Sequence, residues 1–220
     1  MKNKKNKKVV VIMGDLISSS KVEGKNTLIK KIYKTINSIN SSFSNEIILP
    51  LELTRGDEVS TVMLEPGKSF ELCYLINKKI SPDLFRFVIA SGTIDNNMLN
   101  EAKNVNQVTG EVFYKASKMM SVSKRQKLFY NFSLDFKYNE FNQFLNSVAN
   151  FLQLLFNKMT ARQRETVDLY KKLHNQKEVA RIINKKQQTV SSRLKSANWN
   201  YFEKGYNLIN KILKNYNSYK

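Results

Sequence analysis

The period of the apolar residues changes near residue 139, and this change most constrains the fold. Before that point, short apolar runs at 9–13, 47–54, 59–64 and 84–90 have the length and β-branched content of strands. Between several of these runs, the apolar residues recur at helical spacing, which predicts helices. After residue 139, only the helical period continues. The sequence therefore predicts the class α+β, with a sheet domain followed by an all-α domain.

The order of the elements predicts the topology of the first domain. Strand, helix, strand, strand, helix, strand is the ferredoxin-like split unit, and connection rules place its helices on one face of the sheet. The predicted elements are a strand at 9–13, a helix at 28–43, strands at 47–54 and 59–64, a helix at 66–80, a strand at 84–90, a helix at 111–120 and a strand at 127–132. We expect a basic tail at 1–8, a sheet domain at 9–134, a linking helix at 135–158 and a helical domain at 159–220.

Positive charge is concentrated at the two ends of the chain. The 220 residues carry a formal charge of +19, with five lysines in the first eight residues and 15 Lys and Arg against four acids after residue 150. Such an excess favours a polyanionic partner such as DNA, RNA or an acidic membrane face. No apolar segment is long enough to span a membrane, and the single cysteine excludes an intrachain disulfide. We expect a cytoplasmic protein without a membrane partner.

The segment from about 159 to 199 predicts three short helices. Thr160 and Gln163 have the spacing of a capping box, Ala180 is small enough for a close helix crossing, and Asn184 tolerates a left-handed turn. The segment resembles the helix-turn-helix of LuxR-type regulators and of sigma-factor region four, although Asn184 stands where Gly is usual and Lys185 where an apolar residue is usual. The resemblance implies duplex DNA as partner, contacted by Lys186, Gln187, Gln188, Ser191, Ser192, Arg193 and Lys195.

Two acidic turns are the candidate site of the first domain. Asp15 follows the first predicted strand, and Asp57 and Glu58 lie in the predicted hairpin. Because these strands are expected to be neighbours, the carboxylates could meet at one edge of the sheet and hold Mg²⁺ with the phosphates of a nucleotide. The alternative is that Gly-Asp pairs are ordinary turn residues. The predicted nucleotide-binding residues are Gly14, Ser18, Ser19, Arg55 and Gly56.

Nearly the whole chain resembles the SatD family. The matching motifs are IMGDLISSS, TRGDEV, RFVIASG, TGEVFYKASKMM and the helical segment that ends in SANW. The resemblance implies a palm-like domain, similar to nucleotidyl cyclases, joined to a C-terminal helix-turn-helix. It also implies that Asp15 and Asp57 are metal-binding carboxylates, with Glu58 as a third. Arg55 replaces the first glycine of a GGDEF motif, which argues against cyclase chemistry.

Three functions follow from these patterns. The preferred one is a non-enzymatic, DNA-binding transcriptional regulator whose palm-like domain senses a nucleotide or a metal ion. The alternative is a Mg²⁺-dependent nucleotide-processing enzyme, cyclase-like or nucleotidyltransferase-like, which the helical segment only localises. The third is an interaction protein whose basic ends bind RNA or a protein. We also expect a second copy of the chain as partner, in a homodimer, and the sequence identifies no catalytic residue.

Overall fold

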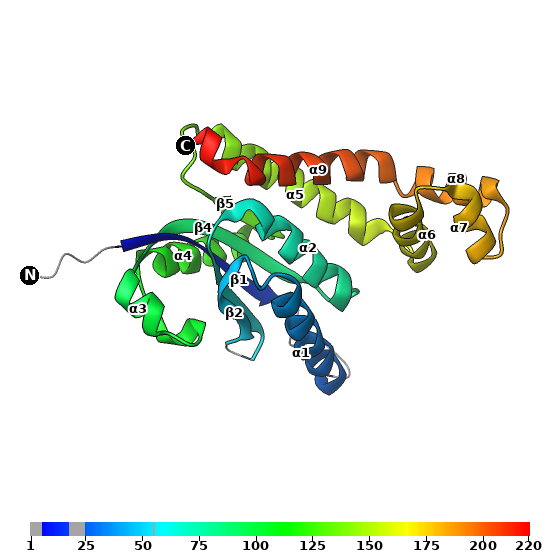
Figure 1. Cartoon of the computed structure of the whole chain (residues 1–220). Helices are drawn as coiled ribbons and strands as arrows, with labels where there is room; N and C mark the ends of the chain where they lie inside the picture. The colour runs from blue at the N-terminus through cyan, green and yellow to red at the C-terminus, as the bar shows by residue number, and fades with distance from the viewer. Residues whose placement is uncertain (1–5, 18–24, 55) are drawn as a thin grey trace, which may run out of the picture. The chain divides into compact units, whose positions relative to one another are not determined.

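The computed structural model describes residues 6–17, 25–54 and 56–220, and the chain forms two compact units (Figure 1). One unit comprises the chain up to Ser147 together with Asn210–Lys220, and the other is Val148–Ile209. The end of the chain therefore belongs with the first unit. The domain boundaries at residues 134 and 158 stay predictions.

A five-stranded sheet in the order β2-β3-β1-β4-β5 forms the centre of the first unit. Its central strand β1 pairs antiparallel with β3 on one side and with β4 on the other, while β5 lies parallel to β4. The first four strands have the order of a ferredoxin-like unit, and the α+β class is confirmed. The strands are β1 (Asn6–Leu16), β2 (Ile47–Leu53), β3 (Glu58–Met63), β4 (Phe85–Asp95) and β5 (Tyr130–Ser133).

Both faces of the sheet are covered by helices. On one face, Phe70 of α2 contacts the ring of Tyr130 on β5, and α2 packs beside α1. On the other face, Val112 and Ala116 of α4 join the apolar cluster that includes Val88. The prediction of helices on one face only is therefore wrong, because consecutive residues of β1 are buried and both faces need a cover. These helices are α1 (Lys25–Ser42), α2 (Ser69–Ile80) and α4 (Glu111–Gln126).

Pairing between β1 and β4 makes both strands longer than predicted. The ladder runs from Leu16 opposite Phe85 to Asn6 opposite Asp95. Residues 6–8 are therefore strand and not tail, and β4 continues beyond residue 90, where the predicted strand ended, to Asp95. The short connections in this unit are α3 (Asn96–Glu101) and the 3₁₀ helices Pro66–Lys68, Val105–Gln107 and Tyr216–Tyr219.

The helix α4 also continues further than its apolar pattern indicates. It ends at Gln126, where Lys127 adopts a left-handed conformation and its N–H donates to the carbonyl oxygen of Lys124. The strand predicted from residue 127 begins only at Tyr130. The difference matters for function, because the extra turn of α4 carries Lys124.

Only helices follow Ser133 in the described chain, as the change of period predicts. Thr160 forms the predicted capping box with Gln163, and Asn184 has the predicted left-handed backbone, with φ of 50°. The structure does not show a separate helix-turn-helix domain, because the unit Val148–Ile209 also contains parts of α5 and α9. The helices are α5 (Glu140–Lys158), α6 (Ala161–Leu173), α7 (Gln176–Ile182), α8 (Gln187–Ser196) and α9 (Trp199–Lys214).

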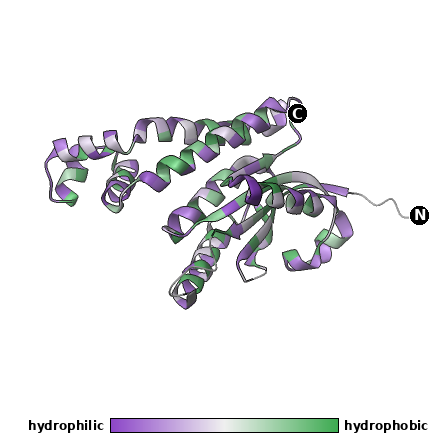
Figure 2. Cartoon of the chain, turned by 180° about the vertical axis from the view of Figure 1, so that it is seen from behind, coloured by the Kyte–Doolittle hydropathy of each residue, from purple (hydrophilic) through white to green (hydrophobic). Residues whose placement is uncertain are grey.

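Within single helices, hydrophobic and hydrophilic residues alternate at short intervals (Figure 2). This is the pattern of amphipathic helices that pack on one side and meet solvent on the other. No helix in the described part of the chain combines the length and the apolar character that crossing a membrane requires.

Candidate functional site

The antiparallel ladder of β1 and β3 aligns two carboxylates. Asp15 lies directly opposite Glu58, so both side chains belong to the same face of the sheet. The backbone N–H of Leu16 donates to the carbonyl oxygen of Asp57 at 3.0 Å, which places Asp57 one position further along. Asp15 and Glu58 therefore lie within neighbouring strands, so the prediction that Asp15 follows its strand in a turn is wrong. The register pairs Asp15 with Glu58 rather than with Asp57. A metal site that includes Asp57 stays a prediction.

Two cations hold the Asp15 carboxylate. Nζ of Lys124 lies 2.6 Å from Oδ1, and Nη1 of Arg86 lies 3.5 Å from Oδ2. Arg86 is itself fixed, because its Nε donates to the carbonyl oxygen of Leu128 at 2.8 Å. Asp15 is only 8 % exposed, and a buried carboxylate needs such partners. The result is a compact charge cluster at the end of β1.

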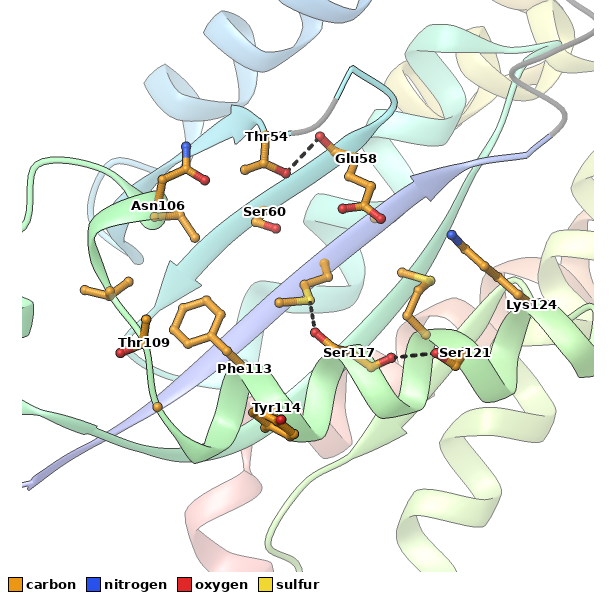
Figure 3. Close-up of a pocket in the computed structure, with 16 residues that line it drawn as sticks. Thr54, Glu58, Ser60, Asn106, Thr109, Phe113, Tyr114, Ser117, Ser121 and Lys124 are labelled. Atoms are coloured by element: carbon orange, nitrogen blue, oxygen red, sulfur yellow. Dashed lines mark hydrogen bonds between the residues drawn. The ribbon is translucent and has the colours of Figure 1, made fainter.

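A cavity of about 600 Å³ lies beside this cluster, between α4 and the sheet. Its wall combines apolar side chains with hydroxyls, one carboxylate and one ammonium group, and Figure 3 shows Glu58 and Lys124 directed toward the same end of β1 from its two sides. Binding pockets for small molecules have this size and this mixture. The lining residues are Met13, Gly14, Thr54, Glu58, Ser60, Val105, Asn106, Val108, Thr109, Gly110, Phe113, Tyr114, Ser117, Met120, Ser121 and Lys124.

One face of α4 supplies part of the polar wall. Phe113, Ser117, Ser121 and Lys124 recur at helical spacing and line the cavity, whereas Tyr114 is 86 % exposed at its rim (Figure 3). Gly110 begins the helix with φ of 155°, a conformation that favours glycine. None of these α4 residues was predicted as a site residue from the sequence, although two serines and a lysine at such spacing on a helix that packs on a sheet were a usable signal.

The predicted nucleotide-binding residues have different surroundings. Gly14 lines the cavity, and Gly56 occupies the hairpin turn with φ of 73°, where glycine is favoured. Ser18, Ser19 and Arg55 lie outside the described residues.

The donor chemistry of the cluster fits a divalent cation in one respect. Mg²⁺ is commonly held by one or two carboxylates and completed by substrate phosphates and water, and Asp15 and Glu58 are such a pair. The ammonium group of Lys124 occupies one carboxylate oxygen of Asp15, which is the position that a metal ion would take. No group of three or more His, Cys, Asp or Glu that could hold a metal ion occurs within residues 6–17, 25–54 and 56–220.

The residues predicted to contact DNA lie on and next to α8. Lys186 is the N-cap of the helix, and most of the set is exposed. Arg193 differs, because it is half-buried and its Nη1 donates to Oγ1 of Thr166 at 3.2 Å. Its guanidinium therefore has a structural partner inside the helical unit.

Comparison with known proteins identifies the family. The model of the SatD family matches residues 9–212, so the chain belongs to the SatD family. Comparison with curated proteins gives no match.

The solved structures that are similar include nucleotide cyclase domains. A bacterial light-regulated adenylyl cyclase is 10 % identical, with 59 % of this chain and 77 % of that chain covered and a TM-score of 0.44. The guanylate cyclase domain of RhGC from Catenaria anguillulae, in complex with GTP, is 17 % identical, with 53 % and 74 % covered and a TM-score of 0.41. The active GGEEF domain of a diguanylate cyclase from Vibrio cholerae is 10 % identical, with 58 % and 83 % covered and a TM-score of 0.38.

These comparisons correct the predicted function. They return nucleotide cyclase domains and give no support for DNA binding, so the prediction of a DNA-binding transcriptional regulator is wrong. The physical reason for the error is that helix caps and a left-handed turn fix three helices locally but do not fix what their surface binds.

Proposed function

We propose that the cavity beside α4 binds a nucleotide and that the chain is a Mg²⁺-dependent nucleotide-processing enzyme. The observation that carries this proposal is the pairing of an apolar wall with a charged end in one cavity of about 600 Å³. A nucleotide has the same division between a flat base and a charged phosphate chain.

The apolar part suits the base. Phe113 is half-buried and lies in the wall of the cavity, close to Val105 and Val108 of the opposite segment. Stacking of a base on an aromatic ring contributes roughly 1–3 kcal/mol to binding. Phe113 is therefore the residue that we expect to contact the base.

The charged end suits the phosphates. Lys124 has three N–H donors on a flexible stem, and the hydroxyls of Ser117 and Ser121 lie on the same face of α4. Asp15 and Glu58 are the residues that would hold Mg²⁺. Bound there, the ion would neutralise charge on the phosphates and polarise a phosphorus–oxygen bond.

Nucleotide binding is tested by calorimetric titration of the full chain with ATP and GTP, with Mg²⁺ and with EDTA. Reaction products are separated by ion-exchange chromatography. Cyclisation and nucleotidyl transfer both release pyrophosphate, so the reactions are distinguished by the other product, a cyclic nucleotide or a nucleotidylated acceptor. Absence of binding by either nucleotide at millimolar concentration would overturn the proposal.

The position of the base is tested by removing one aromatic side chain that lines the cavity and one that does not. Phe113→Ala should weaken nucleotide binding about tenfold, as loss of one stacking contact implies. Tyr33→Ala is the control, because Tyr33 is 51 % exposed on α1 and is not among the residues that line the cavity, and it should change the affinity little. Equal losses in the two variants would show that Phe113 has no special contact with the base.

A further inference from the structure

Resting on the proposed function, we infer that Lys124 keeps divalent cations away from the Asp15–Glu58 pair until the phosphates of a ligand draw its ammonium group off Asp15. The site would then accept a metal ion only together with its ligand.

The two cations on Asp15 differ in their freedom to move. Arg86 is 10 % exposed in its side chain and is held by the Leu128 carbonyl as well as by Asp15. Lys124 is 46 % exposed in its side chain and lies in the last turn of α4, with its Nζ bound to Asp15 at 2.6 Å. Lys124 is therefore the partner that can exchange.

The position of the ammonium group explains the exclusion. It takes Oδ1 of Asp15, which is an oxygen that a metal ion would need. A divalent ion beside the carboxylate would also face the positive charges of both Lys124 and Arg86 at close range, where repulsion is large. Removing Lys124 from Asp15 frees the oxygen and lowers that repulsion.

The cavity provides the place to which Lys124 can move. Its side chain lines the cavity at the charged end, so phosphates bound there would compete with Asp15 for the ammonium group. Phosphates bound beside Glu58 would also add oxygen ligands for the metal ion. Because coupling between two ligands is reciprocal, metal ion and nucleotide should each strengthen binding of the other.

The experiment measures binding of Mn²⁺ alone, by electron paramagnetic resonance of the free ion, to the full chain without nucleotide. We expect Lys124→Gln to bind one Mn²⁺ at least about tenfold more tightly than the wild type, a factor within the usual range of coupled sites. Lys118→Gln is the matched control, because Lys118 is an exposed lysine of the same helix and its change removes the same charge. It should leave Mn²⁺ affinity unchanged.

The second arm measures phosphate binding. Inorganic triphosphate is titrated calorimetrically in EDTA, and its affinity should fall about tenfold in Lys124→Gln but not in Lys118→Gln. The double variant Asp15→Asn/Lys124→Gln should lose the gained Mn²⁺ site, which assigns that site to Asp15. Circular dichroism checks folding, and Lys124→Ala replaces Lys124→Gln if the latter does not fold.

The outcomes separate this inference from the proposed function. If Lys124→Gln gains no Mn²⁺ affinity over the wild type, exclusion by Lys124 is overturned, even when the wild type binds nucleotide with Mg²⁺. If Lys124→Gln gains the Mn²⁺ site but triphosphate binding does not depend on Lys124, displacement by phosphate is overturned. If the wild type binds no nucleotide while Lys124→Gln gains the Mn²⁺ site, the proposed function fails and exclusion stands.

Discussion

Phe87 fills the space that a side chain at position 14 would occupy. A Cβ atom built on Gly14 would lie 2.6 Å from Cε1 of Phe87 and 2.7 Å from Cγ2 of Val59. Such distances are far below van der Waals contact, so packing in the sheet requires a glycine at position 14 of β1. It positions Asp15, the next residue, without needing any contact with a ligand.

Gly14→Ala should therefore lower the free energy of unfolding by about 1–3 kcal/mol, the usual cost of overpacking a core. The measurement is equilibrium unfolding in urea. Gly67→Ala is the control, because the nearest atom to its added Cβ would be 3.6 Å away. Phe87→Leu in the Gly14→Ala background should recover part of the loss. If the two glycine variants are equally stable, the crowding by Phe87 is relieved by small shifts.

The Arg86–Asp15 pair gives the second prediction. Arg86→Met removes a cation from a buried carboxylate and also leaves the Leu128 carbonyl without its donor. Breaking a buried pair costs about 3–5 kcal/mol, and Lys124, which remains on Asp15, should keep the loss near the lower limit. Urea unfolding measures the loss. Arg125→Met is a control on the same region, because Arg125 is exposed, and it should be nearly neutral.

Equal free energies of unfolding for Arg86→Met and the wild type at neutral pH would contradict this prediction. In that case Lys124 alone would suffice to stabilise Asp15. The further change Lys124→Gln in the Arg86→Met background would then decide whether Asp15 needs any cation at all.

What could be predicted from the sequence depends on the range of the interactions. The capping box at Thr160 and the left-handed Asn184 rest on a few neighbouring residues, and both are confirmed. The length of β1 depends on its pairing with β4, so the local pattern placed its beginning three residues too late. The acidic residues of the turns were identified, and their strands are neighbours in the sheet.

The cavity could not be predicted in the same way. It exists because α4 covers the face of the sheet opposite α1 and α2, and a single helical period does not reveal which face a helix covers. Lys124 and Asp15 are far apart in the sequence, so their contact depends on the packing of α4 against the sheet. The roles of Phe113 and Lys124 therefore follow only from the packing of α4 on the sheet, whereas Asp15 and Glu58 were predicted from the sequence.

The capping box of α6 gives the third prediction. Oγ1 of Thr160 accepts from the backbone N–H of Gln163 at 3.2 Å, and Oε1 of Gln163 accepts from the backbone N–H of Thr160 at 2.8 Å. Thr160→Ala should lower stability by about 1 kcal/mol, as loss of an N-cap usually does. Ser192→Ala, at an exposed position inside α8, should change stability much less. Thermal unfolding of both variants checks the difference, and equal melting temperatures would mean that the cap contributes nothing.

The last prediction concerns the pH dependence of stability through Tyr216. This side chain is 4 % exposed, and its hydroxyl oxygen accepts from the backbone N–H of Asp135 at 3.2 Å. Burial raises the pKa of Tyr216 above its ordinary value of 10. The folded chain therefore favours the neutral phenol, while the unfolded chain ionises near pH 10. The contribution of Tyr216 to stability is thus complete below that pH and is lost as the pH rises through the higher pKa of the folded state.

Urea unfolding at pH 8 and at pH 10.5 tests this linkage. The wild type should lose more stability between the two values than Tyr216→Phe, which has no phenol to ionise. Tyr216→Phe should cost little at pH 8, because Oγ of Ser91 also accepts from the Asp135 N–H, at 2.8 Å. Tyr114→Phe is the control, since Tyr114 is 86 % exposed and its change should leave the slope of the wild type intact. Equal slopes for Tyr216→Phe and Tyr114→Phe would show that ionisation of Tyr216 is not coupled to unfolding.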